Sequence, residues 1–277
     1  MHYTRLRVVC DPDFTEILIA EVAEAGFDMF MENENGFEAH GEETGVDQNL
    51  LDEIKKKYEH VNPLIFYQDK IQKENWNEEW EKNVEPIIVE DQCLVRAAFH
   101  NIEKKYPYEI VITPKMSFGT GHHPTTYLML KHQLILNHMG KRVMDAGCGT
   151  AILSVMACKR GAAFVDAFDI DEWSIENGKE NAQLNGCPAI RIRRGTIRDF
   201  QWNEPFDIVL ANINKNILLA EIDAYAASLR PGGHLLLSGF YEKDIPELTE
   251  AAGKLGLQRT SSSTRESWAA LELVRMK

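Results

Sequence analysis

The chain contains few cysteines, and no spacing that would give them a structural task. Its 277 residues include five cysteines, an odd number, widely separated and without a Cys-x-x-Cys pair. A disulfide framework uses an even set of cysteines and a structural zinc site uses closely spaced ligands, so neither is expected. We predict reduced thiols at Cys10, Cys93, Cys148, Cys158 and Cys187.

Long apolar segments are also missing. No stretch approaches the roughly 18 apolar residues that a membrane-spanning helix requires, and residues 1–7 lack the apolar core and cleavage site of a signal peptide. We therefore expect a cytoplasmic protein with no role in a membrane. With 44% apolar and 26% charged residues, a chain of this length can bury one large core and a second, smaller one, which predicts two domains.

Basic residues are scarce in the first third of the chain. Residues 1–90 contain 8 Lys and Arg against 22 Asp and Glu, a net charge of −14, whereas residues 91–277 contain 22 against 21. An acidic front repels nucleic-acid phosphates and attracts a basic partner, so no direct nucleic-acid binding is expected. The alternative is a solvated face that carboxylates keep soluble.

Residues 1–69 have the pattern of a small α+β domain. Apolar alternation and helical spacing predict strand 3–9, helix 14–25, strands 29–31 and 37–39, helix 47–58 and strand 61–67. This order is that of a ferredoxin-like domain. Because the architecture hosts many functions, it assigns none by itself.

Residues 70–95 are predicted to connect this domain to the rest of the chain. Trp76 and Trp80 are four residues apart, which places them on one helical face, and Pro86 ends the stretch. Tryptophan supplies a large packing area, so a packing role is favoured over contact with a substrate.

The most informative segment is residues 143–151, Val-Met-Asp-Ala-Gly-Cys-Gly-Thr-Ala. An apolar strand runs into a glycine turn that opens a helix, and a second apolar strand, 164–169, ends in Asp169 about 20 residues later. This layout predicts a nucleotide pocket at the carboxyl edge of a parallel sheet. Asp169 is placed to accept hydrogen bonds from two ribose hydroxyls.

The glycine turn lacks the third glycine of a dinucleotide fingerprint, because that position is Ile152. The spacing Asp145-x-Gly147-x-Gly149-x-Ala151 resembles instead the first motif of class I S-adenosylmethionine-dependent methyltransferases. Many members carry a third glycine where Ala151 stands. A turn that only joins a strand to a helix is the structural alternative.

From residue 96 onward the pattern predicts a doubly wound, Rossmann-like α/β sheet. The elements expected after the glycine turn are a helix to 160, strand 164–170, helix 172–185, strand 190–195, strand 206–211, helix 216–229, strand 233–238, helix 243–255 and strand 268–275. The connection between the last strand and the one around Ser261 is too short for a helical crossover. An antiparallel last strand is therefore expected, another resemblance to class I methyltransferases.

Three further segments narrow the resemblance to one family. They are residues 114–126, Pro-Lys-Met-Ser-Phe-Gly-Thr-Gly-His-His-Pro-Thr-Thr, residues 212–215, Asn-Ile-Asn-Lys, and residues 231–239, Pro-Gly-Gly-His-Leu-Leu-Leu-Ser-Gly. Together with Trp76, Trp80 and the front domain, they resemble the bacterial ribosomal protein L11 methyltransferase (PrmA) family over nearly the whole chain. The Phe-Gly-Thr-Gly-x-His-Pro-Thr-Thr stretch is the specific element.

The chain departs from the family pattern in two places. His122 stands where threonine is usual, and Asn214-Lys215 replaces the more common Leu-Ala. The second departure lies at the reaction edge and bears on substrate detail more than on methyl transfer. Adjacent His122 and His123 suggest a metal site, but the sequence marks no third ligand, and no metal is predicted.

Seven residues are candidates for cofactor binding. Gly147 and Gly149 have no side chains, so the methionine part of the cofactor can approach the turn closely. Thr126 follows a helix-starting proline, so its hydroxyl either reaches the cofactor carboxylate or is an ordinary helix-start threonine. Thr196 is expected to border the adenine. The set is Thr126, Asp145, Gly147, Gly149, Asp169, Thr196 and Asn212.

Asn212 is also the candidate catalytic residue. Methyl transfer from a sulfonium needs a neutral amine held in line with the methyl group. An α-amino group, with a pKa of about 7.7–8.0, offers some free base at neutral pH, whereas lysine, near about 10.4, must lose a proton first. The side-chain or backbone carbonyl at Asn212 would orient the amine; the alternative is an asparagine that only ends a strand.

The resemblance implies an S-adenosylmethionine-dependent N-methyltransferase that modifies α-amino or lysine ε-amino groups of a basic large-subunit ribosomal protein. The sequence does not fix the oligomeric state, and a monomer is expected. Its expected parts are an acidic substrate-recognition domain, residues 1–69, a connector, 70–95, and a methyltransferase domain, 96–277. Two alternatives are an N-methyltransferase for another protein or a small amine, and a noncatalytic cofactor-binding scaffold.

Overall fold

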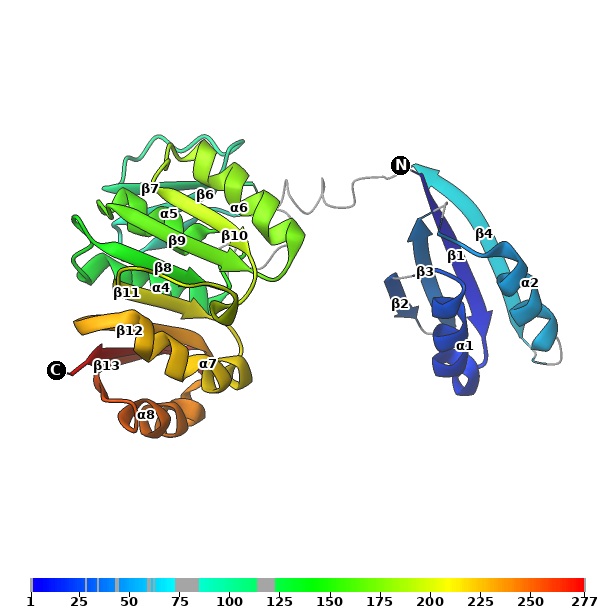
Figure 1. Cartoon of the computed structure of the whole chain (residues 1–277). Helices are drawn as coiled ribbons and strands as arrows, with labels where there is room; N and C mark the ends of the chain where they lie inside the picture. Colours follow the sequence, from blue (N-terminus) through cyan, green and yellow to red (C-terminus); the bar gives the residue numbers. More distant parts are fainter. Residues whose placement is uncertain are drawn as a thin grey trace. The chain divides into compact units, whose positions relative to one another are not determined.

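The computed structural model describes residues 2–27, 29–33, 35–42, 45–58, 61, 63–72, 85–113 and 123–276. The chain divides into two compact units, Met1–Glu78 and Glu79–Lys277, which Figure 1 colours from blue to cyan and from green to red. Trp76, Trp80 and His122, singled out by the sequence, lie outside the described residues.

The first unit contains the six elements that the sequence predicts, in the predicted order. They are β1 (His2–Cys10), α1 (Pro12–Glu24), β2 (Met29–Asn33), β3 (Gly36–Glu42), α2 (Gln48–Lys57) and β4 (Leu64–Gln72). The strands form one sheet in the order β2-β3-β1-β4, and all neighbours are antiparallel. Apolar residues of β1 and β3, including Leu6 and Phe37, pack against Leu18 of α1 and Leu51 of α2 to form its core.

A seven-stranded sheet is the centre of the second unit. Its strands are β8 (Arg142–Ala146), β9 (Phe164–Asp169), β10 (Ile190–Arg194), β11 (Phe206–Asn212), β12 (Leu229–Tyr241), β13 (Leu257–Arg265) and β14 (Trp268–Arg275). Their order is β10-β9-β8-β11-β12-β14-β13. The first five strands in that order are parallel, and β14 is antiparallel to both β12 and β13. The predicted doubly wound sheet and its antiparallel last strand are confirmed.

Helices cover both faces of this sheet. They are α4 (Pro124–Ile135), α5 (Ile152–Lys159), α6 (Glu172–Leu184), α7 (Lys215–Ser228) and α8 (Ile245–Gly253), with short 3₁₀ turns η1 (Ile197–Asp199) and η2 (Glu242–Asp244). Successive strand residues point to opposite faces. Met144 and Ala146 of β8 pack in the core under α7 and α8, whereas Val143 packs in the core under α4 and α5.

A second sheet in this unit was not predicted. It contains β5 (Ile87–Val89), β6 (Cys93–Ala97) and β7 (Tyr108–Ile112), in the order β5-β6-β7. Its buried residues share a core with α4 and α5. Since β4 reaches Gln72 and β5 begins at Ile87, both ends of the segment predicted as a connector, 70–95, lie in sheets.

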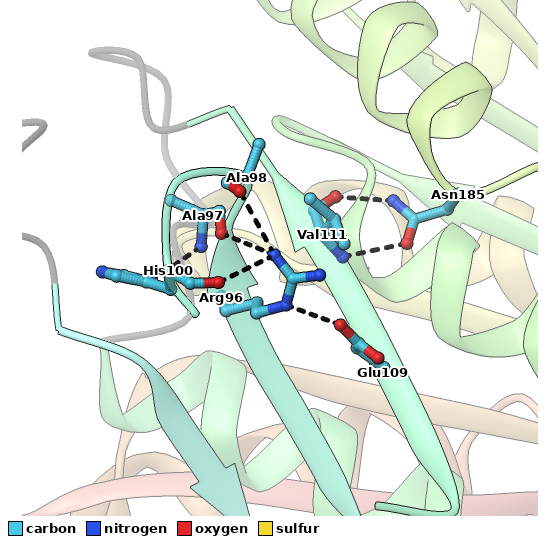
Figure 2. Close-up of polar contacts among 7 residues, drawn as sticks. All are labelled: Arg96, Ala97, Ala98, His100, Glu109, Val111 and Asn185. Carbon is cyan, nitrogen blue, oxygen red and sulfur yellow. Dashed lines mark hydrogen bonds and ion pairs between the residues drawn. The ribbon is translucent and has the colours of Figure 1, made fainter. Parts of the chain in front are cut away.

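Arg96 ties the turn after β6 to β7, as Figure 2 shows. Its Nε donates to Glu109 at 2.5 Å, and its guanidinium also donates to the carbonyl oxygens of Ala97, Ala98 and His100. One charged side chain therefore donates to three carbonyl oxygens of this turn, and that of Ala97 also accepts from the N–H of His100 at 3.2 Å.

All five cysteines are free thiols in the structure. No helix among the described residues is long and apolar enough to cross a membrane.

Candidate functional site

A cavity of about 800 Å³ opens at the carboxyl edge of the seven-stranded sheet. Its walls come from the ends of β8, β9, β10 and β11, from Gly239 of β12 and from the first residue of β14. The strand order reverses between β8 and β11, and ligands of doubly wound folds bind at such a switch point. The volume also falls within the roughly 300–1,000 Å³ of small-molecule sites.

Most of the predicted site residues meet at this cavity. Thr126 and Asp145 are fully buried and do not line it. The other five predicted residues line it: Gly147, Gly149, Asp169, Thr196 and Asn212.

The glycine turn after β8 has an unusual backbone. Gly147, Gly149 and Ala151 all have positive φ, at 65°, 50° and 59°. A Cβ atom added to Gly147 would lie 2.3 Å from Cγ2 of Ile213, so the space beside this glycine is shared with the loop after β11. Ala151 is the N-cap of α5 and adopts a left-handed conformation that disfavours any side chain.

Asp169 is held at the edge of the cavity by two backbone amides. Its Oδ2 accepts a hydrogen bond from the N–H of Gly149 at 2.9 Å, and its Oδ1 accepts one from the N–H of Asp171 at 3.0 Å. Each carboxylate oxygen can accept a further hydrogen bond, so the pair can still receive two hydroxyl groups. Asp171 caps α6 by accepting from the N–H groups of Trp173 and Ser174.

Asp145 lies behind the glycine turn. Its Oδ2 accepts a hydrogen bond from Oγ of Ser154 in α5 at 2.5 Å, and its Oδ1 has no partner among the described residues. Burial raises the pKa of this carboxyl to about 7, although the hydrogen bond from Ser154 acts in the opposite direction. The hydrogen bond to Ser154 links the end of β8 to α5.

Thr126 lies in the first turn of α4. His123 is the N-cap of this helix, and its Nδ1 accepts from the N–H of Thr125 at 3.3 Å. Partial burial lowers the pKa of His123, in keeping with a neutral ring. The Thr126 hydroxyl is buried and has no hydrogen-bond partner among the described residues. Residues 114–122, which precede the helix and include the first five residues of the family-specific stretch, lie outside the described part of the chain.

The side chains of Thr196 and Asn212 differ in their hydrogen bonds. The hydroxyl and the N–H of Thr196 both donate to Oδ2 of Asp199, at 2.8 and 2.7 Å. Thr196 is the N-cap of η1. Asn212 ends β11, is 7% exposed, and its Oδ1 has no partner among the described residues. A buried amide oxygen normally accepts a hydrogen bond, so Asn212 offers an acceptor to a ligand.

Asn214 and Lys215, where the chain departs from the family pattern, both make local hydrogen bonds through their side chains. Oδ1 of Asn214 caps α7 by accepting from the N–H of Ile217 at 3.1 Å, and Asn214 also lines the cavity. Nζ of Lys215 donates to Asp244 and to Glu247, each at 3.0 Å, and Lys215 does not line the cavity.

A group of aromatic residues at the cavity was not predicted from the sequence. Trp268 and His123 both line the cavity, with ring centroids 4.6 Å apart, and Tyr241 stacks on Trp268 at 4.2 Å. Trp268 and Tyr241 are paired in register at the ends of β14 and β12. The sequence signal was the antiparallel last strand, which brings its first residue to the edge where the parallel strands end.

Glu221 and Tyr225 of α7 also line the cavity and were not predicted. They are four residues apart on one helical face, and the Tyr225 hydroxyl donates to the Glu221 carboxylate. Burial is the main cause that raises the pKa of Tyr225, so the hydroxyl keeps its proton.

Comparisons with known proteins agree with the site. The family model described as ribosomal protein L11 methyltransferase (PrmA) matches residues 18–276. A ribosomal protein L11 methyltransferase of Porphyromonas gingivalis is 46% identical over 261 residues, which cover 92% of this chain and 89% of the relative. Another, from Phocaeicola vulgatus, is 39% identical over 267 residues, covering 96% and 95%.

A solved structure also matches. The ribosomal protein L11 methylase of Lactobacillus delbrueckii subsp. bulgaricus has a TM-score of 0.64 and 26% sequence identity, covering 70% of this chain and all of that one. The sequence motifs, the sheet order and the relatives lead to one conclusion: the chain belongs to the ribosomal protein L11 methyltransferase (PrmA) family of S-adenosylmethionine-dependent methyltransferases.

Proposed function

We propose that this protein transfers methyl groups from S-adenosylmethionine to amino groups of ribosomal protein L11, at an α-amino group, at lysine side chains, or at both. The observation that carries the proposal is the cavity with Asp169 at one side and the open amide of Asn212 at another. Membership of the family supplies the substrate.

The residues present fit the cofactor. The Asp169 carboxylate keeps two acceptor positions for ribose hydroxyls. Gly147 and Gly149 leave the edge of the turn without side chains, and Thr196 borders the same cavity. The buried Thr126 hydroxyl has no partner among the described residues but does not line the cavity, so the cofactor carboxylate is not assigned to it. Asp145 supports the turn from behind. When bound, S-adenosylmethionine supplies a methyl group on a positively charged sulfur.

Asn212 orients the acceptor amine. Its Oδ1, buried and open, accepts a hydrogen bond from an N–H of a neutral amine, which directs the nitrogen lone pair away from the carbonyl and toward the methyl group. The amine must lose its proton before it enters, because an ammonium has no lone pair. A neutral carbonyl acceptor needs no change of protonation between transfers, so the site suits repeated methylation.

We further propose a ferredoxin-like N-terminal domain, residues 1–69, that recognises the substrate, joined through 70–95 to a methyltransferase domain, 96–277. Its element order and its antiparallel β2-β3-β1-β4 sheet support the fold. Its acidity suits a basic protein, which fits action on a ribosomal protein in the cytoplasm. If acidic residues steer the substrate, KM for L11 should rise with added salt while the affinity for the cofactor stays the same.

Mass spectrometry of L11 after incubation with the protein and S-adenosylmethionine tests the activity. We expect mass increments of methyl groups on L11, and none with Asp169→Ala. Methyl transfer to another component of a cell lysate, with L11 unmodified, would favour a different N-methyltransferase. Cofactor binding without any transfer would favour a scaffold.

A further inference from the structure

Three asparagines recur along α6 at intervals of four residues: Asn177, Asn181 and the C-cap, Asn185. This spacing places them on one face of the helix. Asn177 and Asn181 are 1% and 0% exposed. Asparagine is a poor helix former, and a buried amide must be hydrogen-bonded. Two buried asparagines on one helical face therefore indicate a task for their amides.

The asparagines pair with the free edge of β7, which is an edge strand. Oδ1 of Asn185 accepts from the N–H of Val111 at 2.9 Å, and its Nδ2 donates to the Val111 carbonyl at 2.6 Å, as Figure 2 shows. Oδ1 of Asn181 accepts from the N–H of Thr113 at 2.8 Å. The amides thus supply hydrogen bonds that a neighbouring strand would otherwise make.

Asn181 alone among these three also reaches the glycine turn. Its Nδ2 donates to the carbonyl oxygen of Thr150 at 2.9 Å and to Oδ1 of Asn177 at 2.6 Å. Thr150 is fully buried and lies between Gly149 and Ala151. Both donor hydrogens of Asn181 and its carbonyl oxygen are engaged, so its orientation is fixed.

Gly178 allows α6 to lie against the same turn. A Cβ atom at this position would lie 3.3 Å from the carbonyl oxygen of Gly149, 3.3 Å from Cβ of Ala151 and 3.1 Å from Cδ1 of Ile192. The turn has three residues with positive φ, one of them Ala151, so it depends on its surroundings to keep its shape. Asp169 holds the Gly149 N–H, and Asn181 holds the Thr150 carbonyl.

We propose that Asn181 is a positioning residue for cofactor binding: its amide holds the glycine turn in the conformation that receives the cofactor and joins the turn to β7. The proposal rests on the proposed function, because the ligand of the turn is S-adenosylmethionine or its demethylated product. Asn181 does not line the cavity and acts through the turn.

Asn181→Asp tests the proposal, with Asn185→Asp as a matched control. Both changes keep a side-chain oxygen for the β7 N–H and replace the amide donor by an oxygen. At position 181 that oxygen faces the Thr150 carbonyl, whereas at position 185 it faces only β7 and the end of α6. We expect calorimetric titration with S-adenosylhomocysteine, at about pH 8 and so well above the reference pKa of about 3.9 for aspartate, to show a Kd at least about tenfold higher for Asn181→Asp. Asn185→Asp should stay within about twofold of wild type.

Gly178→Ala separates positioning from loss of stability. Alanine is favoured over glycine within a helix, so the melting temperature should not fall. The added methyl group must push the turn by a few tenths of an ångström, and we expect a Kd several-fold higher for S-adenosylhomocysteine. This variant decides the question if Asn181→Asp does not fold.

Three results would overturn the proposal. Wild-type affinity in Asn181→Asp and Gly178→Ala would show that the turn needs no support from α6, and the proposed function would stand. An equal loss in Asn185→Asp and Asn181→Asp would assign the effect to β7. If the wild-type protein did not bind S-adenosylhomocysteine, the proposed function would fail first, and the positioning role with it.

Discussion

The side of the cavity proposed for the cofactor and the side proposed for the acceptor amine differ in how their polar atoms are satisfied. On the cofactor side, both oxygens of Asp169 accept backbone N–H groups, one of them from the turn that carries Gly149. On the proposed acceptor side, the buried amide oxygen of Asn212 has no hydrogen-bond partner among the described residues. Satisfied groups keep a binding surface in shape before the ligand arrives, whereas an open acceptor is available to the reacting amine.

The two sides also differ in how far apart their residues lie along the chain. The residues from Asp145 to Asp169 span one strand, turn, helix and strand. Elsewhere on the cavity wall, His123, Asn212 and Trp268 come from the N-cap of α4, from β11 and from β14, which are widely separated in sequence. A local motif therefore encodes the cofactor side, and tertiary packing assembles the acceptor side.

The largest effect is expected on the cofactor side, from Asp169→Ala. Loss of two charge-assisted hydrogen bonds to a ribose, worth about 1.5–3 kcal/mol each, should raise the Kd for S-adenosylhomocysteine by roughly 100-fold or more. Calorimetric titration measures it. Asp171→Asn is the matched control, because asparagine also caps helices; its affinity should change little. An equal loss of affinity in both variants would contradict a specific role of Asp169 in binding the ribose.

Asn212→Ala should affect the acceptor side alone. We expect kcat for L11 methylation to fall by about 10²–10³-fold, as for the loss of one positioned polar group in other active sites, while the Kd for S-adenosylhomocysteine stays within about threefold. A Kd raised as far as in Asp169→Ala, with kcat retained at saturating cofactor, would show that Asn212 binds the cofactor and does not orient the amine.

Asp145→Asn should change how stability depends on pH. Burial raises the pKa of Asp145 to about 7 in the folded protein, above about 3.9 in an unfolded chain. The folded state therefore holds a proton that the unfolded state releases, and the stabilisation from this group is lost as pH rises through about 7. Thermal denaturation at about pH 5 and about pH 8 should show the variant gaining on wild type at the higher pH, by roughly 2–3 kcal/mol. A pH-independent difference would contradict the raised pKa.

Ala151→Gly is expected to have the smallest effect. Glycine relieves the left-handed conformation of Ala151, an effect of about 1–2 kcal/mol, but it also makes the unfolded chain more flexible, by about 0.5–1 kcal/mol. The net gain in the free energy of unfolding should be about 1 kcal/mol or less in a urea titration, with unchanged affinity for S-adenosylhomocysteine. A clear loss of affinity would mean that the alanine methyl group shapes the turn.

Some of the fold was readable from short stretches of sequence. The strands at Phe164–Asp169 and Trp268–Arg275 and the helix at Glu172–Leu184 were predicted to within about two residues. The β5-β6-β7 sheet was not predicted, because residues 70–95 were interpreted as a connector and no strand was assigned between them and the glycine turn. Asp145 belongs to the motif, but the pleat of β8 directs its side chain toward α5 and away from the cavity wall.

The amino-acid sequence by itself determined the glycine turn, the acid that ends the next strand, the doubly wound sheet and the family, because each depends on residues close together in the chain or on a regular repeat. Only the tertiary structure decided that Trp268 and His123 line the same cavity as Asn212, and that Asn181 joins β7 to the turn. Those contacts depend on which distant elements pack together, and no local pattern records that choice.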